Sequence, residues 1–98
     1  MSKLKPGVVW GADYQTLLKA CKEGQYALPA VNVTGTNTIN AVLESAAKNK
    51  SDVIIKLSNG GAEFYAGKGF PDSFQAKVLG AVSAAMHVHA MAEHYGVC

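Results

Sequence analysis

Two patterns of hydrophobic and polar positions take turns along the chain. One is the helical spacing of apolar residues and the other is a short aliphatic run, and each predicts a different element. Helical spacing of apolar positions predicts helices over residues 13–24, 36–48 and 73–96. Between these helices, residues 27–33 and 53–58 are short runs rich in aliphatic residues, which predicts strands. The predicted order is therefore helix, strand, helix, strand, glycine-rich loop and helix.

This order of elements predicts the fold class. Strands that alternate with helices form βαβ units, in which the strands are parallel and helices flank the sheet. The second strand is a continuous apolar run, as expected of a strand that is covered on both faces. Two parallel strands would leave their edges uncovered, and residues 96–98 resemble the beginning of a third strand. We expect an α/β chain that forms the start of a longer protein.

Composition and charge narrow the classes of partner. Hydrophobic residues make up 49% of the 98 residues and charged residues 16%, which favours a folded segment over disorder. The formal charge of +2 is small and the nine basic residues are scattered, so we expect neither nucleic-acid binding nor a polybasic membrane patch. No apolar run approaches the roughly 20 residues that span a bilayer. We therefore expect no membrane association.

The termini and cysteines indicate a cellular compartment. The first residues carry positive charge but no apolar core and no small-residue cleavage pattern, so we expect no secretory signal. Cys21 lies within a predicted helix and Cys98 is the last residue, a spacing that does not resemble a disulfide framework. These features favour a reducing, cytoplasmic setting.

Polar residues lie at the carboxyl ends of both predicted strands, where ligands bind in parallel α/β sheets. Ser58 opens the sequence Ser-Asn-Gly-Gly, whose backbone N–H groups and hydroxyl can approach an anion, although a tight turn would use the same residues. Asn32 lies at the end of the first strand, where its amide can contact a substrate or bond to its own backbone in a turn. Parallel pairing would place Asn32 next to Ser58. We expect both residues to bind substrate.

Lys56 is a lysine inside an apolar run, two residues before Ser58, and therefore faces the same side of the strand. A buried lysine requires an anionic partner or a lowered pKa, and a desolvated lysine is what Schiff-base chemistry uses. An ion pair elsewhere, or extension of the side chain toward the end of the sheet, would satisfy the same residue.

Two other groups of residues carry weaker indications. His87, His89 and His94 suggest a metal site, but residues two apart on a helix point in nearly opposite directions, which favours a structural or interfacial histidine cluster. Lys68 lies between two glycines and could meet a phosphate, although a solvated loop lysine is the commoner outcome.

Three successive segments resemble the amino-terminal part of class II fructose-1,6-bisphosphate aldolases. They are Ala27 to Ala47, Ser58 to Gly69 and His87 to Val97, in the same order and over essentially the whole chain. The resemblance implies that residues 1–98 are an incomplete aldolase barrel domain. This domain would comprise about two βα units, with a preceding helix, of a (β/α)8 TIM barrel.

The resemblance also implies an activity for the parent protein. Members of this family are glycolytic and gluconeogenic lyases, usually homodimeric, that use Zn²⁺ to cleave fructose 1,6-bisphosphate reversibly into dihydroxyacetone phosphate and glyceraldehyde 3-phosphate. By matching motif, Ser58 and Asn32 fall on substrate-binding positions. The acid/base aspartate and the zinc ligands of the family are expected beyond residue 98, so this chain alone is expected to be inactive and to bind no zinc in the family's manner.

The resemblance leaves three points open. Family members often carry glutamine where this chain has Lys56, so the local charge can differ. A tagatose-bisphosphate aldolase shares the barrel and the metal chemistry, although the Ala-Gly-Lys-Gly loop favours the fructose enzyme. A truncated, non-catalytic paralogue that acts as a binding or assembly partner, its strand edge completed by another chain, is the alternative from a different class.

Overall fold

The structure is a computed structural model, and it describes residues 4–98. Along the chain the elements are α1 (Gly11–Gly24), β1 (Ala30–Asn32), α2 (Thr36–Lys48), β2 (Ile54–Lys56), α3 (Asn59–Ala66) and α4 (Ser73–Tyr95). The three predicted helices and two predicted strands are confirmed. Each strand is shorter than expected, with three residues in regular pairing.

The two strands form a parallel sheet, as the βαβ pattern predicts. Ala30 pairs with Ile54, Val31 with Ile55 and Asn32 with Lys56. Among residues 4–98 this two-stranded sheet is the whole of the regular β-structure. The α/β class is therefore confirmed.

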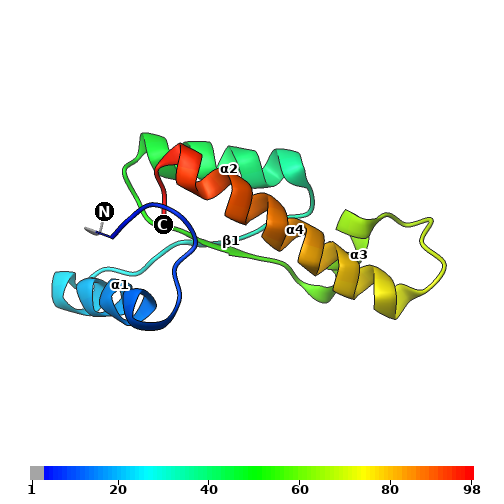
Figure 1. Cartoon of the computed structure of the whole chain (residues 1–98), viewed down its shortest axis with the longest axis horizontal. Helices are drawn as coiled ribbons and strands as arrows, with labels where there is room; N and C mark the ends of the chain where they lie inside the picture. Colours follow the sequence, from blue (N-terminus) through cyan, green and yellow to red (C-terminus); the bar gives the residue numbers. More distant parts are fainter. Residues whose placement is uncertain (1–3) are drawn as a thin grey trace.

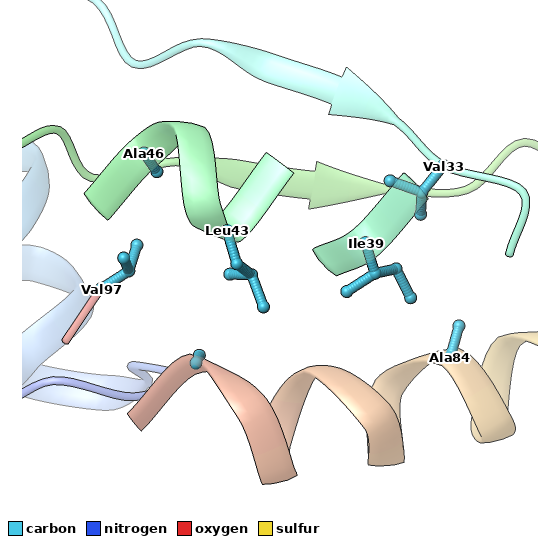
Figure 2. Close-up of a cluster of buried hydrophobic side chains, with 7 residues drawn as sticks. Val33, Ile39, Leu43, Ala46, Ala84 and Val97 are labelled. Carbon is cyan, nitrogen blue, oxygen red and sulfur yellow. The ribbon is translucent and has the colours of Figure 1, made fainter. Parts of the chain in front are cut away.

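Helices α2 and α4 cover one side of the sheet, and α1 lies on the other side (Figure 1). The first half of α4 extends past the carboxyl ends of the strands together with α3 (Figure 1). A buried cluster lies between the sheet, α2 and α4, with side chains from all three directed toward one another (Figure 2). Its buried members are Val33, Ile39, Leu43, Ala46, Ala84, Ala92 and Val97.

The stretch after β2 differs from the prediction of a glycine-rich loop between the second strand and the last helix. Asn59–Ala66 is helix α3, and the connection to α4 is limited to residues 67–72. The helix forms because the Ser58 hydroxyl caps it, and because its small residues Gly61 and Ala62 are buried against neighbouring backbone.

Helices α3 and α4 pack closely through small residues. A Cβ atom built on Gly80 would lie 1.8 Å from the carbonyl oxygen of Ala62, so only glycine allows this approach. Ala76 and Ala84, one turn before and after Gly80, are buried as well. Asp72 begins α4 by accepting hydrogen bonds from the backbone N–H groups of Phe74 and Gln75.

The segment after α4 returns to the amino ends of the strands. The backbone N–H of Val53 donates to the carbonyl of Cys98 at 3.1 Å, and that of Gly7 donates to Val97 at 2.8 Å. This contact aligns residues 97–98 beside β2, the position expected for the beginning of a third strand. Over residues 4–98, none of the helices combines the length and apolar character that crossing a membrane requires.

Candidate functional site

The two faces of the sheet have different surroundings. Val33 is buried, and Ile55 and Leu57 pack against the cluster formed with α2 and α4. The alternate residues point to the opposite face, which we call the open face. Its members are all exposed: Ala30, Asn32, Ile54 and Lys56.

Ser58 follows β2 and keeps an extended backbone, with φ −75° and ψ 166°. Strand alternation therefore continues through it and places its side chain on the same side as Lys56. Its hydroxyl oxygen accepts a hydrogen bond from the backbone N–H of Gly61 at 3.0 Å. The O–H of Ser58 can still donate, so capping α3 leaves this side chain able to bind an acceptor.

The ends of the two strands are held together by backbone contacts. Val33 donates a hydrogen bond to the carbonyl of Lys56 at 3.0 Å. A Cβ atom on Gly61 would lie 3.2 Å from both the Val33 carbonyl and the Ser58 hydroxyl, so the start of α3 rests directly on the segment after β1. The predicted approach of Asn32 and Ser58 at one end of the sheet follows from this contact and from the register of the strands.

The turn after β1 is closed by Thr38. Its hydroxyl accepts hydrogen bonds from the backbone N–H groups of Thr34 at 3.1 Å and Gly35 at 3.0 Å, and donates to the Gly35 carbonyl. The residue that caps α2 is Gly35. Because Thr38 satisfies this turn, the exposed side chain of Asn32 is not required for it.

Lys56 is exposed on the open face, directly across from Asn32 in the sheet register. The ion pairs found among residues 4–98 are Lys19–Glu23 and Lys68–Glu63. Lys56 therefore has no carboxylate within ion-pair distance in the described part of the chain. The lysine is not desolvated here, so the condition for Schiff-base chemistry is not met by these residues.

Lys68 is held at the opposite end of α3. Its ammonium lies 3.3 Å from a carboxylate oxygen of Glu63, and the other oxygen of Glu63 accepts a hydrogen bond from the Ser73 hydroxyl. These contacts lower the pKa of Glu63, through the Ser73 hydrogen bond first and then through Lys68. Sequence reasoning did not single out Glu63, and nothing in its local pattern indicates that it would join α3 to α4.

The histidines of α4 do not converge. His87 lies within hydrogen-bond distance of Asn40 on α2, with its Nε2 atom 2.8 Å from the amide oxygen, which confirms a structural contact for this histidine. His89 and His94 are exposed. Within residues 4–98, no three His, Cys, Asp or Glu side chains are grouped closely enough to hold a metal ion. The residues described here therefore do not fit a zinc centre.

An apolar cavity of about 300 Å³ runs along β2. It is lined mainly by aliphatic residues from the amino-terminal segment, β2 and α4, and neither Asn32 nor Ser58 borders it. Polar groups do not converge in this cavity as they do at the ends of the strands. We therefore place the candidate site at the carboxyl ends of β1 and β2.

Polar side chains at the carboxyl ends of parallel strands are typical of the ligand-binding edge of α/β enzymes. Residues 12–98 match the family described as fructose-bisphosphate aldolase class-II. The chain belongs to this family.

Individual relatives agree with this assignment. The chain is 56% identical over 103 residues to the fructose-bisphosphate aldolase class 2 of Escherichia coli K12, covering 99% of this chain and 29% of the relative. It is 48% identical over 101 residues to the fructose-bisphosphate aldolase of Borreliella burgdorferi, with 99% and 28% covered. The chain thus spans less than a third of the length of these relatives.

A solved structure shows the same arrangement of elements. The crystal structure of fructose-bisphosphate aldolase from Campylobacter jejuni superposes with a TM-score of 0.89 at 52% identity. The match covers 96% of this chain and 26% of that structure. The α/β unit described above is therefore the fold of the corresponding part of a class II aldolase.

Proposed function

We propose that this chain supplies one wall of the active site of a zinc-dependent class II fructose-1,6-bisphosphate aldolase. In this proposal, residues 1–98 form an incomplete barrel domain that contributes the first two strands of a (β/α)8 barrel. The complete cytoplasmic, homodimeric enzyme cleaves fructose 1,6-bisphosphate reversibly into dihydroxyacetone phosphate and glyceraldehyde 3-phosphate. The 56% identity to the Escherichia coli class 2 aldolase supports this proposal.

Within this wall, Asn32 and Ser58 bind the phosphosugar. The observation that carries the assignment is that both exposed side chains reach the same end of one sheet, where a backbone hydrogen bond from Val33 to Lys56 joins the two strand ends. The Ser58 O–H donates to a substrate oxygen while its lone pair caps α3. The start of α3 adds the positive end of a helix to the same edge, which favours an anionic ligand.

The chemistry of carbon–carbon bond cleavage is not assigned to these residues. In the family, bound zinc would supply Lewis-acid chemistry for this reaction. Residues 4–98 offer no ligand set for it, so we derive no catalytic step from them. Their role in this proposal is to bind and orient the substrate.

The chain spans only 29% of its Escherichia coli relative, so its contribution to activity is tested in a chimera with the rest of that enzyme. In the chimera, residues 1–98 replace the matching segment of that enzyme. We expect it to cleave fructose 1,6-bisphosphate. Ser58→Ala should lower kcat/KM roughly tenfold to a hundredfold, the effect of losing a hydrogen bond worth about 1.5–3 kcal/mol to a charged group.

Two further variants separate binding from helix capping. Ser58→Asp keeps a cap acceptor for α3 but removes the donor and adds a negative charge, so we expect a stable chimera with very low activity. Ser83→Ala removes an exposed hydroxyl from the middle of α4 and should change neither property. An inactive chimera, or a Ser58→Asp variant of normal activity, would contradict the proposal.

A further inference from the structure

Lys56 occupies a defined place among the groups of the candidate site. The strand register sets it directly beside Asn32, and alternation places Ser58 on the same side of the sheet. The adjacent residues Val33 and Leu57 pack toward the helices. Three polar side chains therefore share the carboxyl end of the open face: an amide, an ammonium and a hydroxyl.

These three groups differ in charge. Asn32 and Ser58 are neutral hydrogen-bonding residues, whereas Lys56 carries a positive charge. Its ammonium has three donors and no acceptor, so it recognises anionic or carbonyl oxygens. In residues 4–98 no carboxylate lies within ion-pair distance of it, so its charge is not neutralised by this part of the chain.

The other lysine considered as a phosphate contact is already engaged. Lys68 pairs with Glu63 at the far end of α3, and that carboxylate is fixed by Ser73. Lys56 is the lysine that a strand positions, and side chains on strands are held more accurately than those on glycine-rich loops. The cation of this site is therefore placed by the sheet itself.

We propose that Lys56 is a third substrate contact beside Asn32 and Ser58. Its ammonium binds a phosphate oxygen of the phosphosugar. The inference rests on the proposed function for the identity of the ligand. It assigns no covalent role to Lys56. Its side chain binds through charge and hydrogen bonds, and strengthens phosphate binding more than it alters turnover.

The test uses the chimera with Lys56→Gln, which removes the charge but keeps a hydrogen-bond donor on a side chain that is one bond shorter. The probe is inorganic phosphate, titrated directly by calorimetry and as a competitive inhibitor. We expect the Kd of phosphate and the KM for fructose 1,6-bisphosphate to rise roughly tenfold, the effect of one charge-assisted hydrogen bond, with little change in kcat. Raising the salt concentration should weaken phosphate binding less in the variant than in the unmodified chimera.

Lys19→Gln is the matched control, because Lys19 is an exposed lysine on α1 paired with Glu23. It should leave both constants unchanged. An unchanged phosphate Kd in Lys56→Gln would overturn the inference, as would a variant whose thermal stability falls while phosphate binding is retained. That second result would identify Lys56 as the partner of a carboxylate in the rest of the barrel.

Direct titration keeps this inference distinct from the proposed function. A folded chimera without aldolase activity would overturn the proposed function. A phosphate Kd that still depends on Lys56 would then support the anion site alone. A chimera that is active, but whose phosphate Kd does not depend on Lys56, would overturn the inference and leave the proposed function standing.

Discussion

The two faces of the β1–β2 sheet are built from alternate residues of the same short strands, yet they have opposite roles. On the helix-covered face, Ile55 and Leu57 pack against the buried cluster of α2 and α4. On the open face, Asn32 and Lys56 are exposed. The period of two along a strand therefore divides residues that stabilise the fold from residues available to a ligand. Substitutions at neighbouring positions of a strand are therefore expected to affect different properties, either the stability of the fold or the binding of a ligand.

The largest expected effect is on the helix-covered face. Leu43, which is 1% exposed, fills the centre of the cluster between the sheet and α4 (Figure 2). Leu43→Ala should lower the free energy of unfolding of the chimera by about 2–5 kcal/mol, through lost burial and the cavity left behind. Urea denaturation measures this difference.

Leu18 on α1 provides the matched control for Leu43. It is 39% exposed, so Leu18→Ala removes the same atoms from a site that water already reaches. We expect a much smaller loss of stability. Equal losses for the two variants would show that the buried cluster does not carry the stability of this region.

A smaller effect is expected at Gly61, where the start of α3 rests on the segment after β1. A methyl group there would lie 3.2 Å from both the Val33 carbonyl and the Ser58 hydroxyl. Gly61→Ala should therefore cost about 1–3 kcal/mol through overpacking, and should reduce activity by moving Ser58. Thermal unfolding and turnover of the chimera report the two consequences.

Gly60 is the neighbouring control for Gly61. A Cβ on Gly60 would meet only the Ser58 hydroxyl, at 4.0 Å, which is ordinary contact. Gly60→Ala should be neutral, or stabilising by about 0.4–1 kcal/mol, because alanine loses less conformational freedom in a helix. A larger loss of stability in Gly60→Ala than in Gly61→Ala would contradict the close contact between the start of α3 and the segment after β1.

The smallest expected effect depends on pH and lies away from both faces. The Ser73 hydrogen bond and then Lys68 lower the pKa of Glu63 below its ordinary value of 4.5. The folded state therefore holds fewer protons on this residue than the unfolded state. Its stabilisation is present above pH 4.5 and is lost as the pH falls through the folded-state pKa.

Glu63→Gln should accordingly flatten the fall in stability with acid, measured as urea midpoints between about pH 6 and pH 3. Glu23→Gln, which breaks the exposed pair between Lys19 and Glu23 on α1, should have a smaller effect. If Glu63→Gln left the acid-induced fall in stability unchanged, Glu63 would not be a stabilising link between α3 and α4.

Much of this arrangement could be predicted from sequence because it depends on local patterns. The periods of the apolar residues identified the long helices and both strands, and parallel pairing placed Asn32 and Ser58 at one end of the sheet. Helix α3 was missed because Gly60 and Gly61 have low helix propensity, and their helix is stabilised by a cap and by packing. The close approach of Gly80 to Ala62 that supports it joins residues distant in sequence.

Side-chain contacts between distant segments could not be read from any local pattern. The bond between His87 and Asn40 joins α4 to α2, and the contacts of Glu63 depend on the turn between α3 and α4. Helical spacing favoured a structural or interfacial histidine cluster over a metal site, but it could not identify Asn40 as the partner of His87. Tertiary packing decides which of two chemically reasonable roles such a residue takes.

The central claim is that the open face binds the substrate, and Asn32 tests it most directly. Asn32→Ala in the chimera removes an exposed side chain that the fold does not use, so kcat/KM for fructose 1,6-bisphosphate should fall roughly tenfold or more while thermal stability is unchanged. Asn49→Ala, at the far end of α2, should retain full activity. Full activity of Asn32→Ala, or a loss explained by unfolding, would contradict the claim.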